Sequence, residues 1–430
     1  MGIFLLLGLS ELARLKLHWS PGTTRKLIHV LVGCLILFCP FIFGSPNPPM
    51  ILAVIFIIVN LTALMKEKLS GMHGTSRKSY GTVYFPIAFL ILVLFWWDNI
   101  VVFEISLLLL TFADTAATIA GENSKSPKAY IGWKDIKSSQ GTLTMFIVSA
   151  VITGFGTLIL TNLVGNELPN LESIVFLSLF IGIIATLAES FSYAGSDNLS
   201  VPLATAVGYD LFINYTASGE LIHLLGCGLL SLILTLIAVK LKTLTKNGAA
   251  GAWFIGLIVF AMGGIKFAIP LILFFTSSSL LSKIGEKRKE KSPSQPAKIS
   301  KRDIEQVLAN GVIPLILTII WFYTSSEVWY AAYISSVAAA AADTWATEIG
   351  FFSRSSPRNC LNFKKVEKGT SGGITLIGTI GSIIGSIVIV VSACLFIEDK
   401  TLILLLILGG FLGSIIDSIA GAHSGRLQLQ

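Results

Sequence analysis

Apolar residues follow one another along this chain in long runs that are separated by short polar links. Most runs are about 15 to 22 residues long, the length that an α-helix needs to cross a bilayer. The pattern predicts spans over residues 28–44, 50–65, 83–97, 100–120, 142–162, 173–190, 200–216, 221–240, 251–262, 267–282, 312–325, 328–349, 374–395 and 401–421. Residues 1–13 form a further short run, which lacks the basic start and small-residue cleavage site of a signal peptide. We therefore expect an all-α, polytopic integral membrane protein with about 14 transmembrane helices in two fused bundles.

The composition agrees, because 53% of the residues are hydrophobic and only 13% are charged. Cations gather at 14–26, 66–78, 125–137, 240–246, 283–302 and 354–368, whereas the intervening links carry almost none. Threading the spans places every basic cluster on one side, which the positive-inside rule predicts to be cytoplasmic. The net charge of +7 is thus a topology signal, and cations divided among short loops argue against nucleic-acid binding. The five cysteines form no CxxC pair, so neither a disulfide framework nor a zinc site is indicated.

Two nine-residue segments, 113–121 and 342–350, share the pattern ADTxATxxG inside apolar stretches 229 positions apart. Each contains an aspartate, Asp114 or Asp343, and an ionised carboxylate in a membrane costs at least about 2.5 to 3.5 kcal/mol unless it is balanced. A basic Ser/Pro-containing loop follows each segment. A third match then aligns residues 137–144 with 368–375, which pairs Lys137 with Lys368. The repetition indicates function, and it predicts two domains, 1–240 and 241–430.

Carboxylates at the membrane edge, followed by loops of lysine, arginine and small residues before a helix start, are typical of a site for polyphosphate and magnesium. Mg²⁺ prefers carboxylate and phosphate oxygens, lysine neutralises phosphate charge, and a helix N-terminus supplies N–H donors. Phosphoryl transfer depends mainly on such positioning and electrostatics. Other polar residues of the first half could join this site, namely Arg25, Lys26, His29, Arg77, Gly81, Thr82, Glu189, Asp197 and Asn198.

Several segments of the first half carry a family resemblance. They are RKLIHV at 25–30, GTVYFP at 81–86, the first ADTxATxxG segment with Lys137, and ATLAE at 185–189 followed by DNLSVP at 197–202. Over about residues 1–240 the chain resembles phytol kinase and, more distantly, dolichol kinase. The resemblance implies CTP-dependent phosphorylation of a long-chain isoprenoid alcohol. It also implies that Asp114 and Lys137 belong to the nucleotide and metal motif, and Asp197 with Asn198 to a downstream acidic motif.

The second half resembles the family that contains phytyl-phosphate kinase. The matching segments are LTKNGA at 244–249, QVLANG at 306–311, the second ADTxATxxG segment with Glu348, residues 368–373, and Asp417-Ser418. This resemblance implies a second phosphorylation, from prenyl phosphate to prenyl diphosphate. The sequence departs from that family where it stops at Gln430, because the family continues into a further Asn/Asp-containing stretch. The second loop, 351–368, has a net charge of +4 against +2 for 122–137, which favours a more anionic acceptor there.

The candidate residues are assigned three roles. Those predicted to act in catalysis are Asp114, Lys137, Asp197, Asp343, Lys368 and Asp417. Those predicted to bind nucleotide or phosphate are Arg25, Lys26, Arg77, Gly81, Thr82, Gly121, Lys125, Ser139, Gly141, Asn198, Asn247, Asn310, Gly350, Arg354, Thr370 and Gly372. Those predicted to bind Mg²⁺ are Asp114, Asp197, Asp343, Glu348 and Asp417. An alcohol must lose a proton on attack whereas a phosphate monoester is already ionised, so only the first site needs a general base, Asp114 or Asp197.

Two other functions fit parts of the pattern. A secondary transporter also has internal repeats and intramembrane carboxylates, but both motifs here have the same orientation and end at the cytoplasmic edge. A cytidylyltransferase would form a CDP-lipid and release pyrophosphate instead of CDP. We expect isoprenoid alcohol and prenyl phosphate as substrates, CTP as phosphoryl donor, Mg²⁺ as cofactor, the lipid bilayer as surroundings and no nucleic acid as partner.

Overall fold

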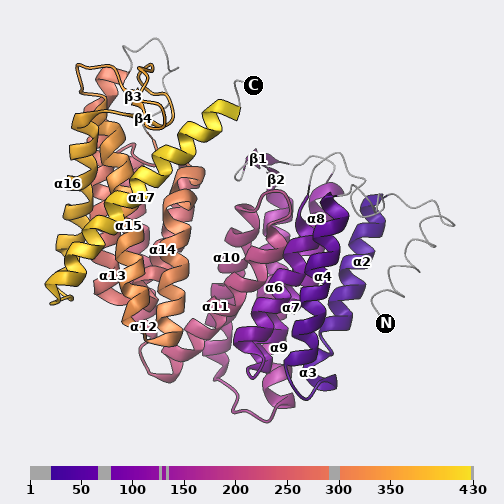
Figure 1. Ribbon diagram of the computed structural model, residues 1–430. Helices are drawn as coiled ribbons and strands as arrows, with labels where there is room; N and C mark the ends of the chain where they lie inside the picture. Colours follow the sequence, from indigo (N-terminus) through magenta and orange to yellow (C-terminus); the bar gives the residue numbers. More distant parts are fainter. Residues whose placement is uncertain (1–20, 66–78, 125–127, 132–134, 290–300, 428–430) are drawn as a thin grey trace. The chain divides into compact units, whose positions relative to one another are not determined.

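The computed structural model describes residues 21–65, 79–124, 128–131, 135–289 and 301–427 (Figure 1). These residues are almost entirely helical, with two short antiparallel hairpins as the only sheets among them. The chain divides into two compact units, Met1–Leu221 and Ile222–Gln430, and each is described by itself. The boundary between the units lies at the start of the helix Leu221–Lys240, whereas the sequence predicts it at the end of that helix. The helix belongs with the second unit because it is hydrogen-bonded to the next helix. Ser231 donates to the Trp253 carbonyl at 3.0 Å, and the Trp253 indole donates to the Gly228 carbonyl at 3.0 Å.

The first unit is a helical bundle with a small hairpin at one end. Its elements are α2 (Pro21–Ile36), α3 (Cys39–Ile42), α4 (Asn47–Met65), α6 (Gly81–Trp96), α7 (Ile100–Leu108), the π-helix η1 (Leu109–Ala113), α8 (Asp114–Glu122), β1 (Ala129–Ile131), β2 (Ile136–Ser138), α9 (Ser139–Leu163), α10 (Leu171–Ser190) and α11 (Asp197–Ala217). Helix α7 forms the centre, with Val102, Phe103 and Ile105 at most 1% exposed. It packs against α9 and α11, while α4 packs against α6 and α2 against η1.

The second unit is built around one central helix. Its elements are α12 (Leu221–Lys240), α13 (Lys246–Lys289), α14 (Ile304–Thr324), α15 (Glu327–Gly350), β3 (Arg358–Asn359), β4 (Gly373–Ile374), α16 (Leu376–Ala393) and α17 (Lys400–Leu427). Helix α15 packs against α13, α14, α16 and α17. Non-helical backbone at Gly264, with φ 61° and ψ −159°, divides α13 into two arms. These arms correspond to the predicted runs 251–262 and 267–282.

Among the described residues, ten helices are long and apolar enough to cross a membrane, and Gly81–Trp96 is a shorter apolar helix. The predicted fold class, an all-α polytopic membrane protein, is therefore confirmed, whereas the count of about 14 spans is not. Helices α11 and α15 are not among the ten, and these two carry Asp197 and Asp343. Large apolar side chains such as Ile58, Ile159 and Leu236 are exposed on the spans, as expected for surfaces that face lipid.

The two units share a helix–hairpin–helix arrangement around the repeated motif. The motif helix, α8 or α15, leads into a hairpin, and the last strand leads into α9 or α16. Ser138 caps α9 by accepting from the Gly141 amide at 3.1 Å, and Thr375 caps α16 by accepting from the Gly378 amide at 3.0 Å. A Cβ atom on Gly141 would lie 2.9 Å from the Ala117 carbonyl oxygen. One on Gly378 would lie 2.8 Å from that of Ala346, which is the same motif position.

This arrangement corrects the third sequence match. Gly141 corresponds in structure to Gly378 and not to Gly372, and Lys137 on β2 corresponds to Ile374 on β4 and not to Lys368. The alignment was wrong because the loop of the second unit is eight residues longer, so matching lysine to lysine shifted the register by six residues. The contact between a cap residue, a glycine and the motif helix is what the two halves have in common.

Candidate functional site

A cavity of about 1200 Å³ runs through the first unit. Its walls come from α2, α3, α4, α6, α8, β2 and the starts of α9 and α11. One end is lined by charged and small polar residues, and the rest is lined by apolar side chains of α2, α3, α4 and α6, including Leu35, Phe38 and Phe56. The cavity therefore has the two-part character of an amphiphile, with a place for a charged group and an arm for a hydrocarbon chain.

Asp114 reaches the charged end because of a local change in helix type. The Asp114 amide donates to the Leu109 carbonyl, five residues back, which closes the π-helix η1 directly before α8. In an α-helix this amide would bond to the Leu110 carbonyl, which here accepts from His29 Nε2 at 2.9 Å instead. Such single π-turns are frequent at functional sites. The π-turn thus leaves the Leu110 carbonyl to accept a hydrogen bond from His29 of α2, and it sets the direction of the Asp114 side chain.

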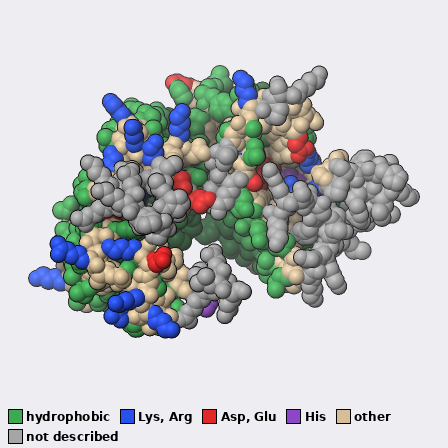
Figure 2. Space-filling model, turned by 90° about the horizontal axis from the view of Figure 1, so that it is seen from above, with side chains coloured by type: hydrophobic (Ala, Val, Ile, Leu, Met, Phe, Trp, Pro, Cys, Tyr) green, Lys and Arg blue, Asp and Glu red, His purple; other side chains and the backbone are tan. Residues whose placement is uncertain are grey.

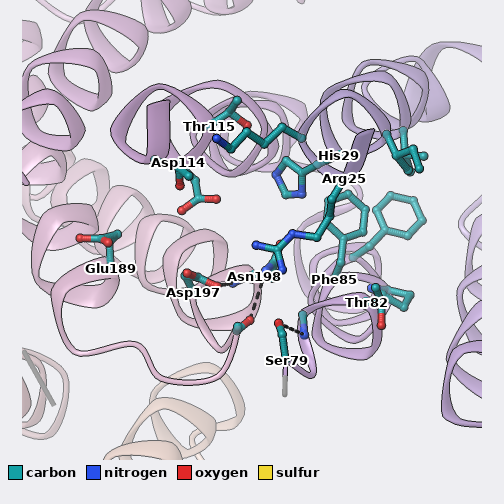
Figure 3. A pocket seen from close by; sticks show the side chains of 18 of the residues that line it. Arg25, His29, Ser79, Thr82, Phe85, Asp114, Thr115, Glu189, Asp197 and Asn198 are labelled. Atoms are coloured by element: carbon teal, nitrogen blue, oxygen red, sulfur yellow. Dashed lines mark hydrogen bonds between the residues drawn. The ribbon is translucent and has the colours of Figure 1, made fainter. Parts of the chain in front are cut away.

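Three carboxylates and two cations meet at this end. Asp114, Asp197 and Arg25 point into the same space, and Glu189 lies to the left of the two aspartates in Figure 3. The charges of Asp197, Glu189, Lys137 and Arg25 all act on Asp114. The positive charges offset part of the cost of gathering carboxylates at a membrane edge.

Lys137 is held in place by the end of α10. Its ammonium donates to Glu189 at 2.5 Å and to Ser192 at 2.9 Å, and Ser192 donates to Asp197 at 3.5 Å. Burial lowers the pKa of Lys137, but the nearby charges of Glu189 and Asp197 raise it by more, so the pKa lies above its usual value. Lys137 consequently carries a fixed positive charge beside Asp114. The second oxygen of Glu189, Oε2, is buried and has no hydrogen-bond partner among the described residues.

The starts of three helices line the charged end, through Gly81 of α6, Gly141 of α9 and Asn198 of α11. The first and third are locked together, because the Tyr80 amide donates to Ala194 at 2.8 Å and Asn198 Nδ2 donates to the Gly195 carbonyl at 3.2 Å. Gly195 has a φ of +87°, and a Cβ there would lie 2.6 Å from the Gly81 amide nitrogen. The N-terminus of a helix carries a partial positive charge, which is favourable for phosphate.

Most residues predicted for the first site do line this cavity. These are Arg25, Lys26, Gly81, Thr82, Asp114, Gly121, Lys137, Gly141, Asp197 and Asn198. Ser139 does not, because its hydroxyl donates to the Lys128 carbonyl at 2.9 Å, and the neighbouring Ser138 lines the cavity instead. Arg77 and Lys125 lie outside the described residues. Lys26 is paired with Glu122 across the rim.

Two further contributors were not selected from the sequence. Asp135 lines the cavity and accepts from the Ala194 amide at 3.3 Å, which joins the hairpin to the loop before α11. The ion pair between Lys137 and Glu189 was also missed, since it joins positions 52 residues apart. Ser138, which caps α9 and lines the cavity, could have been selected from the sequence. A serine three residues before a glycine, at the start of an apolar run, is typical of a helix N-cap.

The side chains at the charged end could bind Mg²⁺ only together with the oxygens of a phosphate. Within the described residues no group of three or more His, Cys, Asp or Glu side chains could hold a metal ion alone. Mg²⁺ usually binds through one or two carboxylates together with substrate phosphates and water. Asp114 and Asp197, both on the cavity wall, are suited to that kind of site.

The residues predicted for the second site lie in separate places. Asp343 on α15 and Asp417 on α17 are close enough for their carboxyls to hydrogen-bond. Glu348 is on a different side of α15, where it accepts from Ser282 of α13 at 2.8 Å. The Lys368 ammonium donates to the Ser353 carbonyl at 2.5 Å. The structure therefore brings Asp343 and Asp417 together.

The remaining predicted residues of this half are distributed along the unit. Gly350 packs beside Gly378, and Gly372 has a φ of +74° against the backbone of Ala422. Thr370 and Arg354 are exposed in the loop between α15 and α16. Asn247 lies in the first turn of α13, and Asn310 lines a second cavity between α12, α13 and α14. Lysine and arginine side chains gather on the face shown in Figure 2.

Comparison with known proteins adds family information. The family model described as integral membrane protein DUF92 matches residues 229–427. The chain is 35% identical over 203 residues to an uncharacterized membrane protein of Methanocaldococcus jannaschii, covering 47% of this chain and 83% of the relative. It is 28% identical over 226 residues to a probable phytol kinase of Glycine max, and the match covers 49% of this chain and 74% of the relative. It is 26% identical over 205 residues to a phytol kinase of Synechocystis, and the match covers 45% of this chain and 80% of the relative. No solved structure matches the chain.

Proposed function

The chain belongs to the family of integral membrane proteins described as DUF92, and we propose that its first unit is a prenol kinase. In this proposal CTP, with Mg²⁺, donates its γ-phosphoryl group to the hydroxyl of a long-chain isoprenoid alcohol such as phytol. The relatives named phytol kinase support the reaction class. In this proposal the charged end of the cavity faces the cytoplasm, and the positive-inside pattern of the basic loops supports that orientation.

The observation that carries the proposal is the continuity of the first cavity. A charged end with three helix N-termini suits a nucleotide phosphate, and the apolar arm beside α2, α3 and α4 suits a hydrocarbon chain. A prenol lying in the arm would place its hydroxyl where the carboxylates gather.

Each side chain has a role that follows from its position. Asp114 or Asp197 accepts the proton that the alcohol loses on attack, and the other would bind the Mg²⁺ that accompanies the donor phosphates. Lys137, kept protonated by Glu189, balances the charge of the transferring phosphoryl group, and Arg25 does so from the opposite wall. Magnesium bound by the carboxylates and the nucleotide would neutralise phosphate charge. The N-termini of α6 and α9, which line the charged end, add partial positive charge for the remaining phosphate oxygens.

For the second unit we propose phosphorylation of the prenyl monophosphate. The repeated helix–hairpin–helix arrangement, the Asp343–Asp417 pair and the exposed cations Arg354 and Arg358 support this step. The acceptor is already ionised at neutral pH, so this unit needs charge neutralisation more than it needs a base. Two linked units would let the monophosphate pass along the membrane surface without leaving it.

The test uses purified protein in nanodiscs with γ-labelled CTP, Mg²⁺ and geranylgeraniol. Asp114→Asn should lower monophosphate formation by at least about 1000-fold, the loss typical of a group on which transition-state chemistry depends. Asp98→Asn, an exposed aspartate in the α6–α7 link, is the matched control and should leave the rate unchanged. Asp343→Asn should allow monophosphate to accumulate without diphosphate. Monophosphate formation by Asp114→Asn within about tenfold of wild type would refute the assignment of the first site.

A further inference from the structure

The second cavity, of about 400 Å³, is lined by Asn310 and by two cations to which no role is assigned above. It lies within the second unit between α12, both arms of α13, and α14. Its walls are apolar side chains and a few hydroxyls, except for two cations, Lys283 and Arg302, and the amides of Gln306 and Asn310. An apolar chamber with two positive charges is complementary to an anionic amphiphile.

Arg302 is fixed in position by its backbone and by aromatic rings. Its amide donates to the Thr243 carbonyl at 2.9 Å, and its carbonyl accepts from the Thr245 amide at 3.0 Å. Its guanidinium lies over the rings of Phe274 and Phe275, at 5.2 and 5.8 Å from the centroids. Such stacking is favourable for a guanidinium and limits its rotation, so the side chain is pre-organised for a planar, bidentate contact with phosphate.

The negative charge of Glu348, on α15, offsets part of the positive charge of Arg302. Glu348 also accepts a hydrogen bond from the Ser282 hydroxyl. The described residues that line the cavity include two cations and no carboxylate, and a phosphate monoester carries about −1.5 to −2 at neutral pH. The pairing also places Arg302 beside α15, and Glu348 is only five residues, about 7.5 Å along the helix, from Asp343.

We propose that this cavity binds the prenyl monophosphate, with its phosphate on Arg302 and Lys283 and the first part of its chain between α12, α13 and α14. The proposal rests on the proposed function and adds the acceptor site of the second unit. It explains why two segments singled out in the sequence, 244–249 and 306–311, come together: Leu244, Gln306 and Asn310 all line the cavity.

The experiment is photo-crosslinking of the full-length protein in nanodiscs with a diazirine analogue of geranylgeranyl monophosphate, without nucleotide, followed by peptide mapping. Label is expected on α12, α13 or α14, and R302Q and K283Q should each reduce it at least tenfold. K301Q, which removes an adjacent cation that does not line the cavity, should leave it within twofold. R302K, which keeps the charge, should restore part of the labelling. Peptide mapping separates this label from any in the first unit.

Competition identifies the ligand. Unlabelled geranylgeranyl monophosphate should displace the probe, whereas geranylgeraniol, inorganic phosphate and phosphatidic acid should not at equal concentration. Equal displacement by phosphatidic acid would overturn the prenyl assignment and make this a general site for lipid phosphates. Absence of label from α12–α14, or labelling unchanged in both R302Q and K283Q, would overturn the site itself. Because no turnover is needed, a protein inactive in the kinase assay but labelled here would reject the proposed function and keep the binding site.

Discussion

Narrowing the apolar arm of the first cavity should make the protein selective for shorter alcohols. Leu52 of α4 lines this arm and is 40% exposed, so a larger side chain can be accommodated there without disrupting the packing of α4 on α6. It lies eight residues, about 12 Å along the helix, from Asn60, in the direction away from the charged end. Leu52→Trp adds about six non-hydrogen atoms and should displace about two to four methylene groups of a long chain. At about 0.8 kcal/mol for each, the loss is about 1.6 to 3.2 kcal/mol, or about 15- to 200-fold in kcat/KM.

The assay compares kcat/KM for geranylgeraniol and geraniol, using γ-labelled CTP and protein in nanodiscs. Leu52→Trp should reduce the value for geranylgeraniol by the stated factor and leave that for geraniol within about threefold, because the shorter chain does not reach position 52. Ile51→Trp is the matched control, since Ile51 is 61% exposed on the same helix and does not line the cavity. An equal loss with both alcohols, or the same selectivity in Ile51→Trp, would refute the assignment of the arm to the chain.

Other predictions concern stability and metal binding. Gly195→Ala should lower the melting temperature by the equivalent of about 1 to 3 kcal/mol, because its φ is +87° and its Cβ would meet the backbone of Gly81; Gly219→Ala, with a similar φ and nothing within 4 Å, should cost less. Since the pKa of Lys137 is raised above 10.5, its charge stabilises the fold below that pH and the contribution is lost as pH rises through the higher folded-state pKa. The melting temperature should therefore fall more steeply with rising alkaline pH for wild type than for Lys137→Gln. Parallel curves of melting temperature against pH would contradict a stabilising charge on Lys137. Magnesium should bind measurably only when CTP or a non-hydrolysable analogue is present, and tight binding of Mg²⁺ alone in calorimetry would contradict the site described at Asp114 and Asp197.

The first site could be predicted well from the sequence because its polar residues stand out in apolar surroundings. Asp114 is conspicuous because a carboxylate is costly inside an apolar run, and Asp197 stands directly before the next such run. Their meeting in one cavity depends on the packing of α11 against α7 and η1, which periodicity does not reveal. The π-turn before Asp114 was equally hidden, since Leu109–Ala113 has an ordinary helical composition.

The second site was predicted less well because residue type guided the alignment. Lys368 was matched to Lys137, but the structure pairs the helix caps Ser138 and Thr375, and the glycine three residues after each. That cap-x-x-glycine signal was in the sequence and would have given the right register. Arg302 carried no such signal, since its position depends on backbone bonds to the α12–α13 link and on two aromatic rings.

The central claim is phosphoryl transfer from nucleotide to a prenol in the first unit, and the position of the label in the nucleotide tests it most directly. Wild-type protein would be incubated with Mg²⁺, geranylgeraniol and CTP labelled in either the α- or the γ-phosphate. Label from the γ-position should appear in lipid and label from the α-position should remain in CDP. Label from the α-position in lipid, with release of pyrophosphate, would instead identify a cytidylyltransferase, and lipid free of label from either position would contradict a kinase.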